Sequence, residues 1–243
     1  MMTARNICGN MRPDVTYKRH KVMTIHMKNE IDRLKKKLLA LSSEVEAQLW
    51  HSVKSIKERD GQLARQVIDH DYSIDQDEVD VEEECLKILA LYQPVAVDLR
   101  FIVTAFKINN DLERIGDLSV NIAERSEFLA SHEPVEVPFD FDTMAEKVQT
   151  MLRNSITALV TLDCVLAYQV CRSDDEVDAL NKQMYDLVKQ GILEHPRHIE
   201  SLIHLLSVSR HLERIADHAT NIAEDVIYMV EGSIIRHKTE KYS

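Results

Sequence analysis

An internal duplication constrains the fold of this chain more than any other feature. The stretch DLERIGDLSVNIAE at residues 111–124 returns as HLERIADHATNIAE at residues 211–224. A second stretch, residues 60–75, aligns without a gap onto residues 163–178, with matching leucine, alanine, glutamine, valine and aspartate positions. These two correspondences predict that the chain is a tandem duplication of one structural unit.

Helical periodicity runs through the first copy. Apolar residues recur three or four positions apart over residues 29–59, which predicts a long amphipathic helix. A second helix is predicted over residues 62–92, and it ends before Pro94 because proline cannot continue the helical hydrogen-bond ladder. A third helix is predicted over residues 95–130, so the first unit contains three helices.

The same pattern returns in the second copy. A fourth helix is predicted to begin near Phe141, Ser173 and Asp174 are predicted to cap a fifth, and a sixth follows Pro196 and ends near Gly232. Only five glycines and five prolines occur in 243 residues, which fits helices better than turn-rich β folds. Two units are too few for a solenoid, and each has enough apolar helix surface to close a bundle. We therefore expect an all-α fold, a tandem pair of antiparallel three-helix bundles.

The predicted boundaries divide the chain into five segments. The stretch HEPVEVP at residues 132–138 carries two prolines and is the best candidate linker. The first residues show no sustained periodicity and are predicted to form a flexible extension. The segments are an N-terminal extension (1–27), a first bundle (28–131), a linker (132–139), a second bundle (140–232) and a C-terminal tail (233–243).

Charge and hydropathy exclude several classes of protein. The formal net charge of −11 disfavours nucleic-acid binding, because phosphates are neutralised by basic surfaces. No apolar run approaches the ~20 residues that span a bilayer, and the N-terminus lacks the apolar core of a signal peptide. The four cysteines form no C-x-x-C pair and are predicted to be reduced thiols. The expected location is the cytoplasm, with peripheral membrane association through partners only.

The duplicated helix carries two carboxylates one turn apart. Glu113 and Asp117 in the first copy, and Glu213 and Asp217 in the second, are spaced i and i+4, with Cβ atoms ~5–6 Å apart. On an exposed helix their repulsion costs only about 0.2–0.5 kcal/mol, so a solvated acidic face is one interpretation. Apolar neighbours predict partial burial, which increases the repulsion and favours a functional interpretation.

A small residue lies inside each of these acidic pairs. Gly116 separates the first pair and Ala216 the second. A glycine inside a helix costs about 1 kcal/mol relative to alanine, so it usually has a packing or functional reason. We expect Gly116 to allow an adjacent helix to approach closely.

A second acidic pair with the same spacing lies on the preceding helix of each copy. Each bundle can therefore bring four carboxylates together, and such a cluster is hard to keep ionised without a cation. Oxygen ligands suit Mg²⁺, Mn²⁺, Ca²⁺ or iron, and bridging carboxylates favour more than one metal per cluster. The candidate ligands are Asp71, Asp75, Glu113 and Asp117 in the first unit, and Asp174, Asp178, Glu213 and Asp217 in the second.

Two alternatives stand beside a metal-binding regulator. One is a helical scaffold whose acidic faces are simply solvated. The other is a carboxylate-bridged multinuclear metal enzyme, a hydrolase or an oxidase. The Glu-x-x-His pairs of di-iron proteins do not occur in the sequence, and neither do nucleophile-elbow or phosphate-loop motifs. The sequence therefore predicts metal binding without catalysis.

Three histidines spaced by seven residues line one helix face in the second copy. His204, His211 and His218 form this stripe. His211 lies roughly 200° around the helix from Glu213, so the stripe does not join the carboxylate cluster. We predict that these histidines lie on the surface.

The motifs together resemble a known family. Residues 94–100, PVAVDLR, precede LERIGD at residues 112–117, and the second copy carries LERIADHATNIAE at residues 212–224. With the D-x-x-x-D pairs, these motifs occur in order and at matching spacing over residues 29–232. In this respect the chain resembles PhoU, a family of bacterial phosphate-transport accessory and regulatory proteins.

The resemblance carries expectations about fold and function. It implies two similar three-helix bundles that hold multinuclear metal clusters on the protein surface, with iron or zinc in some members and manganese, magnesium or nickel as alternatives. It also implies a homodimeric negative regulator of phosphate uptake and of the phosphate-starvation response, and not an enzyme. Such a regulator links the ATPase of the phosphate ABC transporter to a membrane sensor histidine kinase when phosphate is plentiful. The eight carboxylates match the acidic motifs of the family.

One motif is not duplicated. In the second copy Pro196 is followed by RHIE instead of a copy of VAVDLR. Any role of Asp98 or Arg100 is therefore expected in one half of the chain only.

Overall fold

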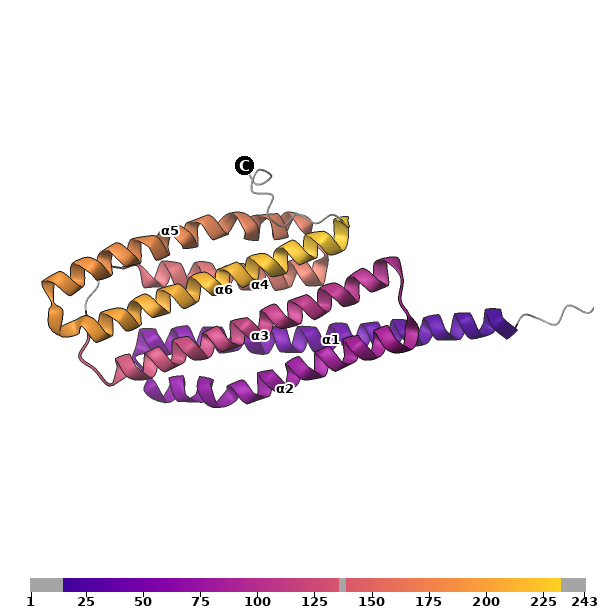
Figure 1. Cartoon of the computed structure of the whole chain (residues 1–243), viewed down its shortest axis with the longest axis horizontal. Helices are drawn as coiled ribbons and strands as arrows, with labels where there is room; N and C mark the ends of the chain where they lie inside the picture. Colours follow the sequence, from indigo (N-terminus) through magenta and orange to yellow (C-terminus); the bar gives the residue numbers. More distant parts are fainter. Residues whose placement is uncertain (1–14, 136–138, 233–243) are drawn as a thin grey trace, which may run out of the picture.

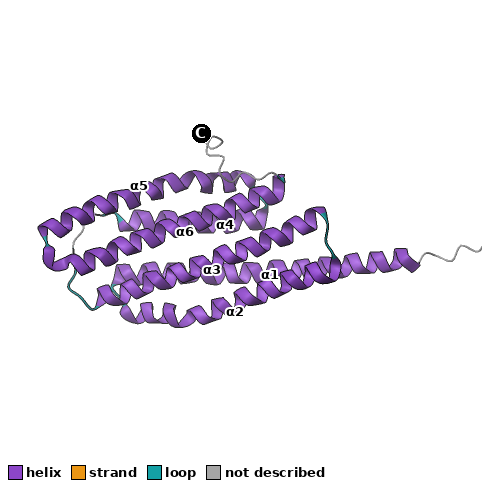
Figure 2. Cartoon of the chain, in the orientation of Figure 1, coloured by secondary structure: helices purple, strands orange, loops and turns teal. Residues whose placement is uncertain are grey.

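The computed structural model describes residues 15–135 and 139–232. Within them the chain is helical and contains no strand (Figures 1 and 2). This confirms the prediction of an all-α fold. The elements in chain order are α1 (Val15–Glu58), α2 (Gly61–Tyr92), α3 (Ala96–Ala130), α4 (Phe141–Thr161), α5 (Cys164–Glu194), the 3₁₀ helix η1 (Pro196–His198) and α6 (Ile199–Glu231).

The helices form two three-helix bundles that lie side by side (Figure 1). Helices α1, α2 and α3 pack together, as do α4, α5 and α6, and α3 packs against α6 between the two bundles. The apolar stripe predicted for the first helix is buried, with Leu34, Leu41 and Leu49 fully inaccessible. Buried residues of both bundles belong to one continuous hydrophobic core, so the two units share a single interior.

Aspartates at equivalent positions begin the second helix of each bundle. The Asp60 carboxylate accepts hydrogen bonds from two backbone amides of α2, and Asp163 does the same for α5. These contacts satisfy amides that have no partner inside a helix. The prediction that Ser173 and Asp174 cap the fifth helix is wrong, because Asp163 starts that helix ten residues earlier. The Ser173 hydroxyl instead donates to a carbonyl oxygen within α5.

The first helix begins earlier than the predicted start of the first bundle at residue 28. Helix α1 starts at Val15, so part of the predicted extension over residues 1–27 is helical. Residues 1–14 and the predicted tail, residues 233–243, lie outside the described residues. In the described part of the chain no helix combines the length and the apolar character needed to cross a membrane.

The histidine stripe of α6 faces α3 rather than solvent, and the prediction that it lies on the surface is wrong. Helices α3 and α6 run antiparallel, as the colours in Figure 1 show. His218 Nδ1 lies 2.8 Å from Asp111 Oδ1, and the ring of His204 stacks on Phe128 with centroids 3.8 Å apart. The spacing of seven placed these side chains on one face, but only packing decided which neighbour that face meets.

The middle histidine of the stripe is held neutral in this interface. Burial lowers the pKa of His211 to about 4, and the positive charges of Arg125, Arg214 and Arg210 act in the same direction. The hydroxyl of Ser207 lies 3.1 Å from His211 Nε2. His211 is therefore an uncharged packing residue between the bundles at neutral pH.

Candidate metal centres

The first candidate cluster lies where α2 packs against α3. Burial is the largest effect on the pKa of the Asp71 carboxyl and raises it, while a hydrogen bond from Gln48 lowers it. The negative charges of Asp75 and Asp117 raise it further. Burial also raises the pKa of Glu113, and the charge of Asp117 adds to this effect. The structure thus brings the four predicted carboxylates of the first unit into one electrostatic group.

The second cluster lies at the equivalent place between α5 and α6. Burial raises the pKa of Asp174 to about 7, with further contributions from the charges of Asp217 and Asp178. The Oδ1 atom of Asp174 is buried and has no hydrogen-bond partner among the described residues. Burial also raises the pKa of Glu213 and of Asp217. The four predicted carboxylates of the second unit are therefore neighbours as well.

The oxygen atoms of the clusters are suitable ligands for a cation, but the side chains are not already arranged around a position for one ion. Across residues 15–135 and 139–232, no three histidine, cysteine, aspartate or glutamate side chains are arranged to hold one ion. All predicted ligands offer oxygen, which hard and borderline cations prefer. The buried Oδ1 of Asp174 is an unsatisfied acceptor of the kind that a bound cation satisfies. A cation would also offset the repulsion that raises these pKa values.

Two charged residues outside the predicted set join the first cluster. The charge of Glu78, which lies two turns from Asp71 on α2, contributes to the raised pKa of Glu113. Arg114 Nε lies 3.3 Å from Glu113 Oε2, and one of its terminal nitrogens lies 3.3 Å from Asp117 Oδ2. The arginine side chain is 60% exposed, so these contacts offset only part of the repulsion. The i+7 spacing of Glu78 from Asp71 was a signal that the sequence already contained.

Gly116 lies at the contact between three helices. A Cβ atom at this position would lie 3.3 Å from Gln48 Oε1 on α1 and 3.4 Å from Ile74 Cγ2 on α2. Asp71 Oδ1 would be 3.9 Å away. The prediction that Gly116 allows a neighbouring helix to approach closely is confirmed, and α1 approaches as well as α2.

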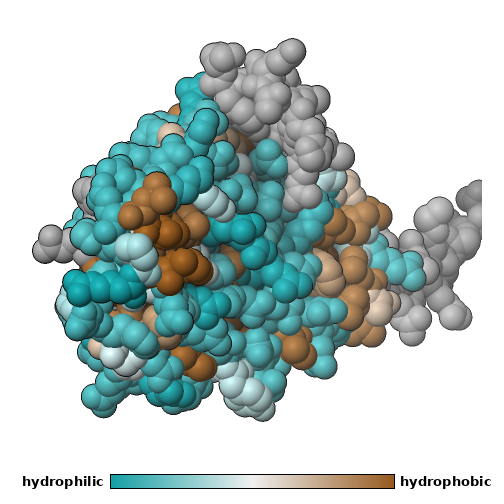
Figure 3. All heavy atoms as spheres, turned by 60° about the vertical axis from the view of Figure 1, so that its left-hand side comes forward, coloured by the Kyte–Doolittle hydropathy of each residue, from teal (hydrophilic) through white to brown (hydrophobic). Residues whose placement is uncertain are grey.

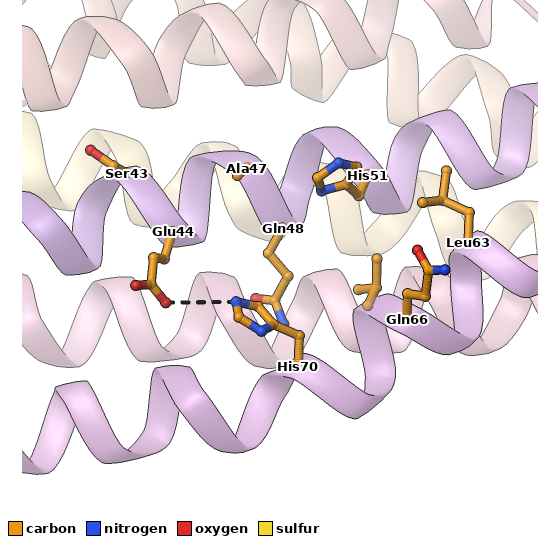
Figure 4. A pocket seen from close by; sticks show the side chains of 9 residues that line it. Ser43, Glu44, Ala47, Gln48, His51, Leu63, Gln66 and His70 are labelled. Atoms are coloured by element: carbon orange, nitrogen blue, oxygen red, sulfur yellow. Dashed lines mark ion pairs between the residues drawn. The ribbon is translucent and has the colours of Figure 1, made fainter.

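Gln48 adds a third helix to the first cluster, and no periodicity in the sequence connects it to the acidic pairs. This α1 side chain is 2% exposed, and its Nε2 donates to Asp71 Oδ1 at 3.2 Å. It also lines a groove of about 450 Å³ between α1 and α2 (Figure 4). In this groove His70 Nε2 lies 3.6 Å from Glu44 Oε2. Gln48 therefore separates the acidic cluster from a solvent-accessible groove.

The second cluster has no counterpart of Gln48. The hydroxyls of Ser52 in α1 and Ser155 in α4 make the same bond, each to the carbonyl three residues earlier at 2.8 Å. This match aligns α1 with α4 and places Met151 where the first unit has Gln48. Met151 is 2% exposed and offers no donor. The second cluster therefore lacks the hydrogen bond that favours the ionised form of Asp71 in the first.

We predict that Gln48→Met raises the pKa of Asp71, because the substitution removes the donor that stabilises its ionised form. The reciprocal change Met151→Gln should lower the pKa of Asp174. Carboxyl ¹³C chemical shifts of metal-free protein, titrated by nuclear magnetic resonance, measure both values. Gln66→Met, at the exposed side of the same groove, is the matched control and should leave Asp71 unchanged. An unaltered titration of Asp71 in Gln48→Met would contradict the assigned role.

Comparison with known proteins places this pair of bundles in a family. The PhoU domain family matches residues 38–126 and residues 141–226. The chain belongs to the PhoU family. The two matches fall one in each bundle, and each contains both acidic pairs of its unit.

Relatives and solved structures cover most of the chain. It is 39% identical over 209 residues to the phosphate-specific transport system accessory protein PhoU homolog of Aquifex aeolicus, covering 86% of this chain and 95% of that protein. The crystal structure of PhoU from Pseudomonas aeruginosa matches with a TM-score of 0.81 at 36% identity, covering 85% of this chain and 99% of that chain. The PhoU regulatory protein from Streptococcus pneumoniae matches with a TM-score of 0.75 at 26% identity, covering 86% and 98%. The resemblance to PhoU inferred from the motifs is thus confirmed.

Proposed function

We propose that this chain is a metal-binding accessory protein of a phosphate-specific transport system that restrains phosphate uptake and the phosphate-starvation response. It acts as an adaptor between the ATPase of the transporter and a sensor histidine kinase. Relatives that share more than a third of its residues over most of its length carry the name of a transport-system accessory protein, which supports this role. The name describes an accessory function, so the proposal assigns no catalytic step.

The observation that carries the metal-binding part is the pair of four-carboxylate clusters. Each bundle holds partly buried carboxyls whose pKa values are raised by burial and by one another. Groups that repel in this way stabilise one another only when a cation or a proton lies between them. Bound iron or zinc, in multinuclear clusters, would supply that charge at neutral pH. Manganese, magnesium and nickel are the alternatives.

Metal analysis of the purified, reconstituted chain tests this proposal. The double variants Glu113→Gln/Asp117→Asn and Glu213→Gln/Asp217→Asn should each lose about half of the bound metal, since each removes two oxygen ligands from one cluster. Glu83→Gln with Asp186→Asn, two exposed carboxylates outside the clusters, is the control and should bind as the wild type does. A chain that stays metal-free on reconstitution, or whose metal content survives both double variants, contradicts metal binding.

A further inference from the structure

Apolar side chains form separate groups on an otherwise mostly polar surface (Figure 3), and one such group lies at one end of the molecule. The turn between α2 and α3, the turn between α4 and α5, and the end of α6 meet at this end, on the right in Figure 1. Val95 is 73% exposed, Val97 62%, Leu162 53% and Val165 69%. Monomeric soluble proteins rarely leave such groups of large apolar side chains open to water unless something binds there. We call this surface, Val95–Leu99 with Val160–Val165 and Val230, the apolar end.

A cavity of about 450 Å³ opens within the apolar end. Its walls come from both bundles, because α1 and α3 supply one side and α4 and α6 the other. The volume lies in the range of sites that bind a ligand or an inserted side chain. The apolar residues that line it are Ile31, Leu38, Leu39, Val97, Phe101, Leu159, Val160, Leu162, Met229 and Val230.

Two positively charged side chains, Lys35 and Arg100, line this apolar cavity. Arg100 lines it, and its Nε is buried with no hydrogen-bond partner among the described residues. The ammonium of Lys35 lies 5.1 Å from the centroid of the Phe101 ring, also in the cavity wall. Among the described residues that line the cavity, Asp98 is the one acidic residue, so this lining carries a positive balance in a chain of net charge −11. An unsatisfied guanidinium donor in such surroundings selects an anionic acceptor.

We propose that the apolar end docks an amphipathic helix of a partner protein. The apolar face of that helix covers the exposed valines and leucines, and a carboxylate on it reaches Arg100. This mode matches the insertion of helices into hydrophobic grooves, where anchor side chains recur along one face. This proposal assigns a role to the motif PVAVDLR, which only the first copy carries. Val95, Val97 and Leu99 provide apolar contact surface, and Arg100 provides the positive charge that binds the carboxylate.

Two other occupants fit less well. A small amphiphile would fill the cavity but leave uncovered the valines outside it, such as Val95 and Val165. A membrane surface with anionic lipids would meet Asp98 and the neighbouring carboxylates Asp163 and Glu231, which repel it. A partner helix can cover the apolar surface and present a single carboxylate to Arg100 at the same time.

The test measures how tightly the metal-loaded full chain binds the purified transporter ATPase and the cytoplasmic part of the sensor kinase. This choice of partners rests on the proposed function. Val97→Lys/Leu162→Lys and Arg100→Met should each weaken binding to one of them by about tenfold or more, as loss of an interface anchor does. The matched control is Leu193→Lys/Ile203→Lys. These residues are 81% and 53% exposed near the opposite end of the bundles and should bind as wild type.

The outcomes distinguish failure of the docking proposal from failure of the proposed function. Unaltered binding by the apolar-end variants, or weaker binding by the control, overturns the docking proposal and leaves the adaptor function standing. Wild-type protein that binds neither partner overturns both. Dissociation of a dimer with partner affinity unchanged assigns the surface to a second copy of the chain and also overturns docking. If a variant fails to fold, hydrogen exchange of the wild type decides, because partner binding should protect residues 91–103 and 158–166.

Discussion

Asp174→Asn is expected to raise the stability of the metal-free protein at pH 7–8 and to remove the contribution of this carboxyl to the dependence of stability on pH. The carboxyl of Asp174 has an ordinary pKa of 3.8, which burial and its acidic neighbours raise to about 7. Between these values the folded chain holds a proton that the unfolded chain releases. The contribution of Asp174 to the free energy of unfolding therefore falls as the pH rises through this window. The isosteric amide carries no charge and removes this dependence.

The size of the effect follows from the same shift. A difference of roughly three pKa units corresponds to about 4 kcal/mol at 1.36 kcal/mol per unit. Partial access of solvent to the cluster reduces this to about 1–3 kcal/mol. Thermal unfolding of chelator-treated protein at pH 5, 6, 7 and 8 measures it. Asp71→Asn is the control and should show a smaller gain, because Gln48 already stabilises the ionised form of Asp71. The same dependence of stability on pH in the wild type and in Asp174→Asn would contradict the prediction.

Lys107→Met is expected to destabilise the contact between the bundles. Lys107 of α3 donates to Asp225 of α6, with Nζ 3.1 Å from Oδ1, and the aspartate side chain is only 3% exposed. The same ammonium lies 5.5 Å from the centroid of the Tyr228 ring. Removing one partner of a buried ion pair costs about 3–5 kcal/mol, because the remaining charge stays desolvated. Lys107 is 39% exposed and Asp225 has a further interaction, so we expect a smaller loss of about 1–2 kcal/mol.

Urea unfolding of a double-mutant cycle isolates this interaction. Asp225→Asn in the Lys107→Met background should recover part of the loss, because it removes the buried charge. Lys189→Met, which breaks an exposed pair with Asp186 on α5, is the control and should cost less than about 0.5 kcal/mol. Equal losses in Lys107→Met and Lys189→Met would show that the contact between the bundles does not depend on this pair.

The fold was largely predictable, since the repeat and the helical periodicity both lie in local sequence. The six α-helices and their two-unit organisation follow from the spacing of apolar residues and from Pro94 and Pro196. The predicted start of α5 was wrong because Ser173 and Asp174 are residue types that often cap helices. The carboxylate that accepts hydrogen bonds from the first backbone amides of α5 is that of Asp163. Capping depends on which amides are free, and spacing within a helix does not reveal this.

The site was predictable where its members share a helix and hidden where they do not. Glu113 with Asp117 and Asp71 with Asp75 are one-turn pairs, so their common faces follow from the sequence. Gln48 lies on a third helix, and no periodicity connects it to Asp71. Its contact exists because Gly116 lets α1 and α2 approach α3 together. The repeat pairs position 48 with position 151, but only the contact of Gln48 with Asp71 shows why this difference affects the cluster.

By itself the sequence determined the duplication, the helices and the eight carboxylates, because each rests on identity or on spacing along one chain segment. The tertiary structure alone decided that the histidine stripe faces α3, that Gln48 serves one cluster only, and that the cavity at the apolar end is built by both bundles. These features depend on which faces of different helices meet. Helical period fixes the direction of a side chain around its own axis, whereas the identity of its neighbour follows from how the whole core packs.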